Sequence, residues 1–234
     1  MIVGALTAAL TLGGAQAYAA DLEIVIDRHE DAIELFVATP ASNFGPIFGA
    51  TPAGLANSDG LVEIDPLRQG TWAIGDALFR DTNATTGDEP VVFEAMSFMV
   101  HPVEDRVPMT DPLEAVLAVS VCTVDLPGQV FALDRLFGYA GFIAYTGRAG
   151  DALSVDFAET GRGTLDVSVR TFDRGRPTGS FTAGIADGGT LVIPAYQGAP
   201  FPIWAALLAL CGLGASAGGV ALHRIRLRRT LRPA

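Results

Sequence analysis

The chain contains no lysine, and all 15 of its basic residues are arginines. Without a lysine amine, lysine-dependent phosphate-binding loops, Schiff-base chemistry and Ser-Lys hydrolysis are excluded. A GC-rich genome, which encodes its cationic residues as arginine, explains this bias without any functional pressure.

Cysteine is scarce as well, with only Cys122 and Cys211 present. Cys211 falls in an apolar C-terminal segment, so we expect no disulfide within a folded domain. The absence of any Cys-x-x-Cys motif removes support for thioredoxin-like redox chemistry, zinc ribbons and covalent haem attachment. Cys122 lies in the apolar run AVSVCTV and is predicted to be a small buried residue in a strand.

Basic residues are few in the segment that contains all of the acidic residues. All 26 acidic residues lie between Asp21 and Asp187, where only ten arginines occur, a net of about 16 negative charges. The other five arginines follow residue 222. Such an acidic segment repels nucleic acid and attracts cations, so we expect no nucleic-acid partner.

Catalytic signatures are also missing. The sequence has no Gly-x-Ser-x-Gly, His-Glu-x-x-His, EF-hand loop or dinucleotide-binding glycine pattern. We therefore expect a non-enzymatic protein without a cofactor, with a cation or a carbohydrate as the ligand. One alternative is a periplasm-facing hydrolase acting through Asp or Glu, for which Glu104 with Asp105 and Asp88 with Glu89 are candidate pairs. The same pairs also suit calcium coordination. The other is a single-span accessory subunit of a membrane complex.

The first 19 residues are typical of a signal peptide. An apolar run over residues 2–17 leads into Ala17-Tyr18-Ala19, which places small residues at positions −3 and −1 of a cleavage site. We predict removal of residues 1–19 by signal peptidase. A buried N-terminal helix is the alternative.

The C-terminal segment is typical of a membrane anchor. Residues 201–222 carry no charge and match the ~20 residues that cross a bilayer. The basic tail that follows, residues 223–234, predicts a cytoplasmic C-terminus and an ectodomain in the periplasm. Further features fit a span: Trp204 falls near its outer edge, and Gly214 and Gly218 form a small-xxx-small pair. The basic tail includes Arg224, Arg226, Arg228 and Arg229.

The same tail resembles a known class of sorting signal. Pro200-Phe201-Pro202-Ile203, then an apolar run, then an arginine cluster is similar to the tripartite tails of exosortase-type systems (VPLPA or PEP-CTERM-like). The resemblance covers about 35 residues and implies recognition by a sorting enzyme, with transfer to the cell surface or extracellular matrix. A permanent anchor in the inner membrane, in contact with lipid, is the alternative.

Residues 20–193 are predicted to form one all-β domain, an antiparallel β-sandwich, followed by a stalk at residues 194–200. Short runs rich in Val, Ile, Phe and Thr alternate with turn residues, which favours this class. The predicted strands are residues 22–27 with 32–37 as a hairpin, 91–100 and 115–124 as buried central strands, and 153–158, 165–170, 180–185 and 190–193. Residues 40–60 are predicted to be a surface loop with a short helix, and residues 134–141 an irregular excursion.

Two groups of side chains suggest ligand chemistry. His29, Glu30 and Asp31 predict a charged hairpin turn, with a metal or acid-base site as the alternative. The thioethers of Met96, Met99 and Met109 with the imidazole of His101 suit copper, although we prefer core packing. The sequence alone assigns no metal. An envelope protein or a polysaccharide is the expected partner.

Overall fold

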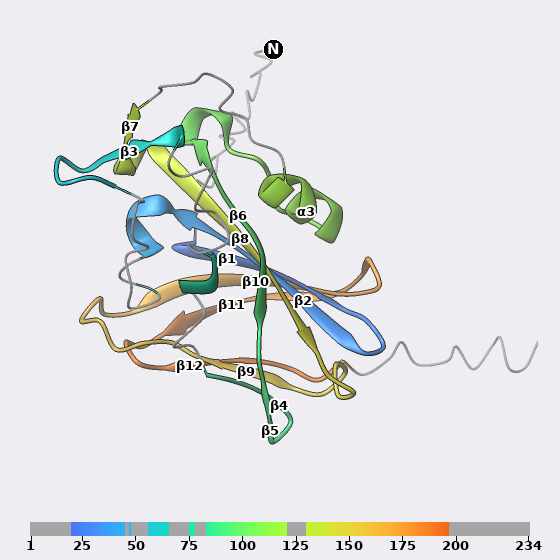
Figure 1. The fold of residues 1–234 in the computed structure, drawn as a ribbon. Helices are drawn as coiled ribbons and strands as arrows, with labels where there is room; N and C mark the ends of the chain where they lie inside the picture. The colour runs from blue at the N-terminus through green and yellow to red at the C-terminus, as the bar shows by residue number, and fades with distance from the viewer. Residues whose placement is uncertain are drawn as a thin grey trace, which may run out of the picture. The chain divides into compact units, whose positions relative to one another are not determined.

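The fold is described by a computed structural model, which covers residues 20–44, 47, 56–65, 75–77, 83–120 and 130–196 (Figure 1). The chain divides into two units, residues 1–196 and 197–234, and every described residue belongs to the first. The predicted signal peptide, membrane helix and basic tail therefore lie outside the described residues, as does most of the stalk.

The larger sheet has six strands in the order β11-β10-β1-β2-β8-β6. All of its pairings are antiparallel except that of β1 with β10, which is parallel. The strands are β1 (Leu22–Arg28), β2 (Ala32–Pro40), β6 (Glu94–Pro102), β8 (Leu136–Tyr145), β10 (Leu165–Asp173) and β11 (Arg176–Ile185).

The other strands form two smaller sheets. One has four strands in the order β12-β9-β4-β5, and the other pairs β3 with β7. These strands are β3 (Leu61–Glu63), β4 (Ala84–Thr86), β5 (Glu89–Val91), β7 (Val130–Ala132), β9 (Leu153–Asp156) and β12 (Thr190–Ile193). Three 3₁₀ turns are described: Ala41–Asn43, Val103–Asp105 and Leu133–Arg135.

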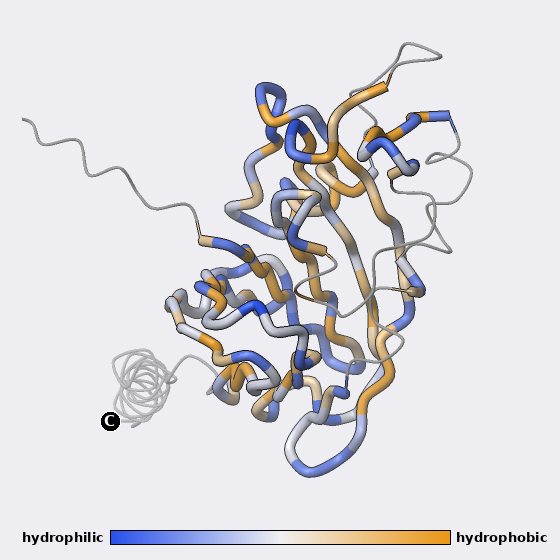
Figure 2. The backbone as a smooth tube through the Cα atoms, turned by 90° about the vertical axis from the view of Figure 1, so that its left-hand side faces the viewer, coloured by the Kyte–Doolittle hydropathy of each residue, from blue (hydrophilic) through white to orange (hydrophobic). Residues whose placement is uncertain are grey.

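Apolar side chains cover both faces of the six-stranded sheet, and hydrophobic stretches run along its strands (Figure 2). On one face they join residues of β4, β5, β9 and β12 in a single cluster. On the other they meet helix α3 (Pro112–Ser120), which Figure 1 shows opposite the four-stranded sheet. Successive side chains of β1 point to opposite faces of the sheet, so Ile24 and Ile26 lie on the first face and Val25 lies on the second.

The all-β prediction is confirmed. The predicted N-terminal hairpin forms as β1 and β2, and the predicted C-terminal strands form as β9 to β12. The interval 91–100 is covered by the end of β5 and most of β6, with a break at Val92 and Phe93. Within residues 40–60, predicted to be a surface loop with a short helix, the described residues include the 3₁₀ turn Ala41–Asn43. The surface position is wrong for Ala41, Phe44 and Ile47, which are buried in the core.

The prediction of a central strand at residues 115–124 is wrong, because residues 112–120 form α3. The start of this helix is strongly specified. Asp111 Oδ1 accepts a hydrogen bond from Glu114 N–H at 2.9 Å, which caps the first turn. Pro112 occupies the first helical position, where its missing N–H costs nothing. Glu114 in turn accepts from the backbone and hydroxyl of Thr110. These local contacts outweigh the strand-like composition of the segment, and Cys122 lies outside the described residues.

The prediction of an irregular excursion at residues 134–141 is also wrong, since most of it belongs to β8, between β2 and β6. Two glycines of this strand are sites of close contact. A Cβ at Gly138 would collide with the ring of Phe44, and one at Gly141 would lie 3.2 Å from Phe36 Cδ1. Each glycine leaves room for an aromatic ring.

In the described part of the chain, no helix is both long enough and apolar enough to cross a membrane. The predicted span at residues 201–222 was not among the residues searched.

Candidate metal centre

The hairpin of β1 and β2 brings three ionisable side chains together. Its loop consists of Glu30 and Asp31 and is closed by a 2.8 Å hydrogen bond from His29 N–H to the carbonyl of Ala32. This register places Glu34 directly opposite Asp27. His29 follows Asp27 by two positions, so alternation directs both to the same side of the hairpin. The loop length therefore assembles a cluster of Asp27, His29 and Glu34.

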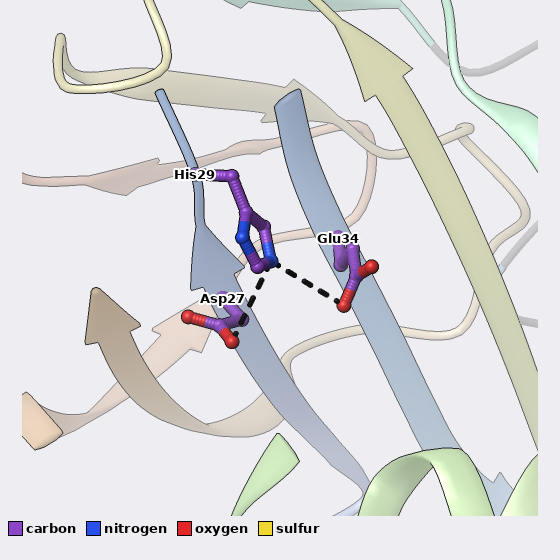
Figure 3. A group of neighbouring side chains, drawn as sticks. All are labelled: Asp27, His29 and Glu34. Carbon is purple, nitrogen blue, oxygen red and sulfur yellow. Dashed lines mark ion pairs between the residues drawn. The ribbon is translucent and has the colours of Figure 1, made fainter. Parts of the chain in front are cut away.

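The geometry of the cluster is open enough for an ion. One ligating atom from each residue lies within 4.8 Å of the other two. His29 Nε2 is 3.6 Å from Asp27 Oδ2 and 3.6 Å from Glu34 Oε2, with the imidazole between the two carboxylates (Figure 3). These separations exceed the 2.7–3.2 Å typical of N–H···O hydrogen bonds. His29 Nε2 is buried and has no hydrogen-bond partner.

Asp27 is held in place by the neighbouring hairpin of β10 and β11. Its two carboxylate oxygens accept hydrogen bonds from Gly175 N–H, each at 3.0 Å. The loop residues Arg174 and Gly175 both have positive φ, 50° and 73°, as a two-residue type I′ turn requires. Arg174 N–H also donates to the carbonyl of Arg28 at 3.0 Å. The two adjacent turns thus fix the aspartate, whose side chain is only 6% exposed.

A groove adjoins the cluster. It encloses about 590 Å³ and shares Gly175 with the Asp27 contact. Its lining mixes polar, charged and small residues with one aromatic ring: Thr110, Asp111, Arg170, Phe172, Gly175, Pro177, Gly179 and Ser180.

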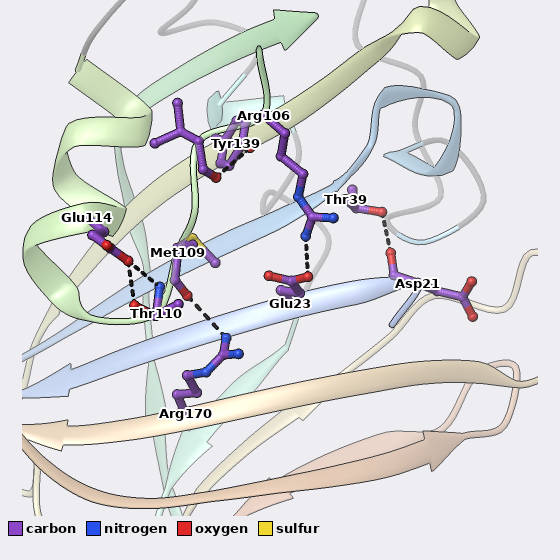
Figure 4. A network of polar contacts seen from close by, with 10 residues as sticks. Asp21, Glu23, Thr39, Arg106, Met109, Thr110, Glu114, Tyr139 and Arg170 are labelled. Atoms are coloured by element: carbon purple, nitrogen blue, oxygen red, sulfur yellow. Dashed lines mark hydrogen bonds and ion pairs between the residues drawn. The ribbon is translucent and has the colours of Figure 1, made fainter. Parts of the chain in front are cut away.

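A polar network secures one wall of this groove (Figure 4). Arg170 Nη1 donates to the carbonyl of Met109 at 3.1 Å. Arg106 forms an ion pair with Glu23 and lies 4.1 Å above the ring centre of Phe137. Tyr139 donates to the carbonyl of Val107 at 2.9 Å, and burial raises its pKa to about 12. These contacts fasten the segment before α3 to the sheet.

The structure divides the methionine and histidine group: His101 and Met109 are buried, whereas Met96 and Met99 are half-buried on β6. His101 is fully buried, its ring is 5.0 Å from that of Tyr139, and its Nε2 is 2.8 Å from the carbonyl of Ala118. Met109 is buried in the same cluster as Tyr139. The histidine nitrogen that copper would need thus contacts a backbone carbonyl, and we assign His101 to core packing.

The predicted acid pairs lie at exposed turns. Glu104 contacts Arg135 at 3.2 Å, and Glu89 contacts Arg148 at 3.3 Å. Asp88 and Asp105 are also exposed. Neither pair lines the groove beside the hairpin cluster.

The charged hairpin turn predicted at His29, Glu30 and Asp31 is present, with Glu30 and Asp31 as its exposed loop. Of these three residues only His29 belongs to the cluster, whose carboxylates come from Asp27 and Glu34. The two-residue loop was the signal that identifies Glu34. The predicted residues of the signal cleavage site and of the anchor all lie outside the described residues.

No protein-family model and no curated protein sequence matches the chain.

Proposed function

We propose that the chain is an exported bacterial envelope protein whose β-rich ectodomain, a β-sandwich, acts by binding rather than by catalysis. In this proposal, signal peptidase removes residues 1–19, and the C-terminal segment either anchors the protein or is recognised by a sorting enzyme. The ectodomain then resides in the periplasm or at the cell surface. The sandwich is supported by the apolar cluster that the six-stranded and four-stranded sheets share.

The observation that carries the binding role is the groove beside the β1–β2 hairpin. Its lining offers hydroxyl groups at Thr110 and Ser180, a carboxylate at Asp111, a guanidinium at Arg170 and the ring of Phe172. Hydrogen-bonding groups around one aromatic ring suit a polyhydroxylated ligand. We therefore propose an envelope polysaccharide as the partner.

The test is co-sedimentation of the full chain, purified in mild detergent, with insoluble polysaccharide isolated from the bacterial envelope. Ser180→Trp adds bulk to a groove residue of β11, whereas Thr182→Trp adds the same bulk two positions along the strand, outside the groove lining. The proposal predicts that Ser180→Trp reduces the bound fraction at least tenfold and that Thr182→Trp does not. Equal binding by both variants, or no binding by the unaltered chain, contradicts it.

A second candidate, an accessory subunit of a membrane complex, is favoured by α3. Leu113, Val116 and Leu117 occupy adjacent positions on this helix and are 69%, 36% and 47% exposed. An exposed apolar helix face is typical of a protein-protein contact. Such a subunit co-purifies with partners in mild detergent, whereas a surface module purifies alone.

A further inference from the structure

The cluster of Asp27, His29 and Glu34 contains an electrostatic conflict. Asp27 and Glu34 are opposite each other on neighbouring strands, where two like charges destabilise a sheet. Within the described part of the chain, His29 is the only cationic partner recorded for either carboxylate. The surrounding domain is itself strongly acidic. The arrangement therefore calls for a positive charge between the two strands.

The contacts of His29 with the two carboxylates are too long to be hydrogen bonds. The imidazole nitrogen is 3.6 Å from each carboxylate oxygen, which is longer than a charge-assisted hydrogen bond of about 2.7–2.9 Å. The nitrogen remains buried without a hydrogen-bond partner. An unsatisfied buried nitrogen is costly, so its retention beside two carboxylates points to a ligand.

We propose that Asp27, His29 and Glu34 bind one divalent first-row transition metal ion of the Zn²⁺ class. A metal about 2.1 Å from each donor, in tetrahedral or octahedral geometry, requires neighbouring donors roughly 3.0–3.4 Å apart. The two 3.6 Å separations from His29 Nε2 reach that range with side-chain movements of a few tenths of an ångström, and the donor atoms of Asp27 and Glu34 lie within 4.8 Å of each other. The inference goes beyond the envelope location and the polysaccharide groove and depends on neither.

The donor set selects this class of ion. Ca²⁺ and Mg²⁺ take oxygen ligands, whereas Zn²⁺ and its neighbours accept imidazole nitrogen together with carboxylate oxygen. The contact of Asp27 with Gly175 N–H is a second interaction of the kind that orients metal-binding carboxylates. Only two adjacent strands and their turn are needed, so the domain presents these donors as a preformed site.

The site lies close to the surface and is coordinatively incomplete. The side chains of His29 and Glu34 are 36% and 24% exposed, while the nitrogen His29 Nε2 is itself buried between the carboxylates. Three protein donors leave at least one position of a tetrahedral ion open to water or to an external ligand. Gly175, whose N–H bonds Asp27, also lines the groove.

The test is isothermal titration of the chelator-treated full chain with Zn²⁺ in mild detergent. We expect one saturable Zn²⁺ site per chain. His29→Gln and Glu34→Gln each remove a ligand. Each should therefore lower the affinity for Zn²⁺ by more than the ~10–100-fold that removal of an outer-shell partner costs. The matched control is Glu30→Gln, an identical carboxylate-to-amide change in the same hairpin, which leaves affinity unchanged. Zn²⁺ should also raise the melting temperature of the unaltered chain but not that of the His29 or Glu34 variants.

Two further measurements use the unaltered chain, so they test the site even if one variant folds poorly. Co²⁺ bound to the unaltered chain should give visible absorption bands that Glu34→Gln weakens and Glu30→Gln preserves. Ca²⁺ in excess should leave Zn²⁺ bound. Equal Zn²⁺ affinity in all variants, the absence of a saturable site, or displacement of Zn²⁺ by Ca²⁺ overturns the proposal.

Discussion

At the scale of single residues, burial decides what each titratable side chain does. His101 and His29 have the same chemistry, but His101 is enclosed between β6 and α3, whereas His29 lies at a hairpin between two carboxylates. Burial lowers the pKa of His101 more than the hydrogen bond to Ala118 and the charge of Asp105 raise it. Proximity in sequence to methionines is therefore a weaker guide to function than the environment of the ring.

The depressed pKa of His101 predicts a pH dependence of stability. An unfolded histidine titrates near pH ~6.5, so below that pH the unfolded chain takes up a proton that the folded chain resists. The contribution of His101 to the free energy of unfolding is thus complete above pH ~6.5 and decreases as the pH falls from there. Urea unfolding of the full chain at a series of pH values measures it against His101→Gln. Parallel curves for the two proteins contradict the assignment, because contributions from all other groups cancel in their difference.

At the scale of secondary-structure elements, local contacts at α3 override composition. The residues Ala115–Ser120 are as apolar as those of a buried strand, yet the Asp111 cap and Pro112 commit the chain to a helix. The sequence Thr-Asp-Pro-Leu-Glu contains this helix-start signal, an N-cap aspartate followed by proline.

The cap makes a quantitative prediction. Asp111→Ala removes the acceptor of the Glu114 N–H and should lower the free energy of unfolding by about 1 kcal/mol, while Asp111→Asn retains an oxygen and should cost much less. Urea unfolding monitored by circular dichroism provides the measurement. If the alanine and asparagine variants are equally stable, the hydrogen bond is not what starts the helix.

For the whole molecule, strands whose pattern is local could be predicted from the sequence, whereas the pairing of strands distant in sequence could not. Alternation identified β1, β9 and β10. Burial alternates along β9 and β10, whereas β1 is buried on both faces. Nothing local to β1 or β10 specifies their parallel pairing, which depends on chain segments distant in sequence. The glycines of β8 make room for the rings of Phe44 and Phe36, which come from distant segments, so no local pattern indicated that residues 136–141 are a strand.

In the candidate metal centre too, the local arrangement was predictable from the sequence and the long-range contacts were not. Once the loop at Glu30 and Asp31 is known to have two residues, register alone places Glu34 opposite Asp27. The contact of Asp27 with Gly175 depends on a distant hairpin, as does the groove. Hence the three donor residues could be predicted from the sequence, whereas the Gly175 contact that orients Asp27 is known only from the folded structure.

Export of a binding module to the bacterial envelope is tested by the intact mass of the native protein recovered from membrane and surface fractions. We expect a mature chain that begins at Ala20 and, in the surface fraction, lacks the residues beyond about Pro200. A membrane-bound chain that keeps its arginine tail removes the sorting proposal and favours the accessory-subunit candidate. A mass that still includes residues 1–19, in a soluble fraction from inside the cell, contradicts the claim of export.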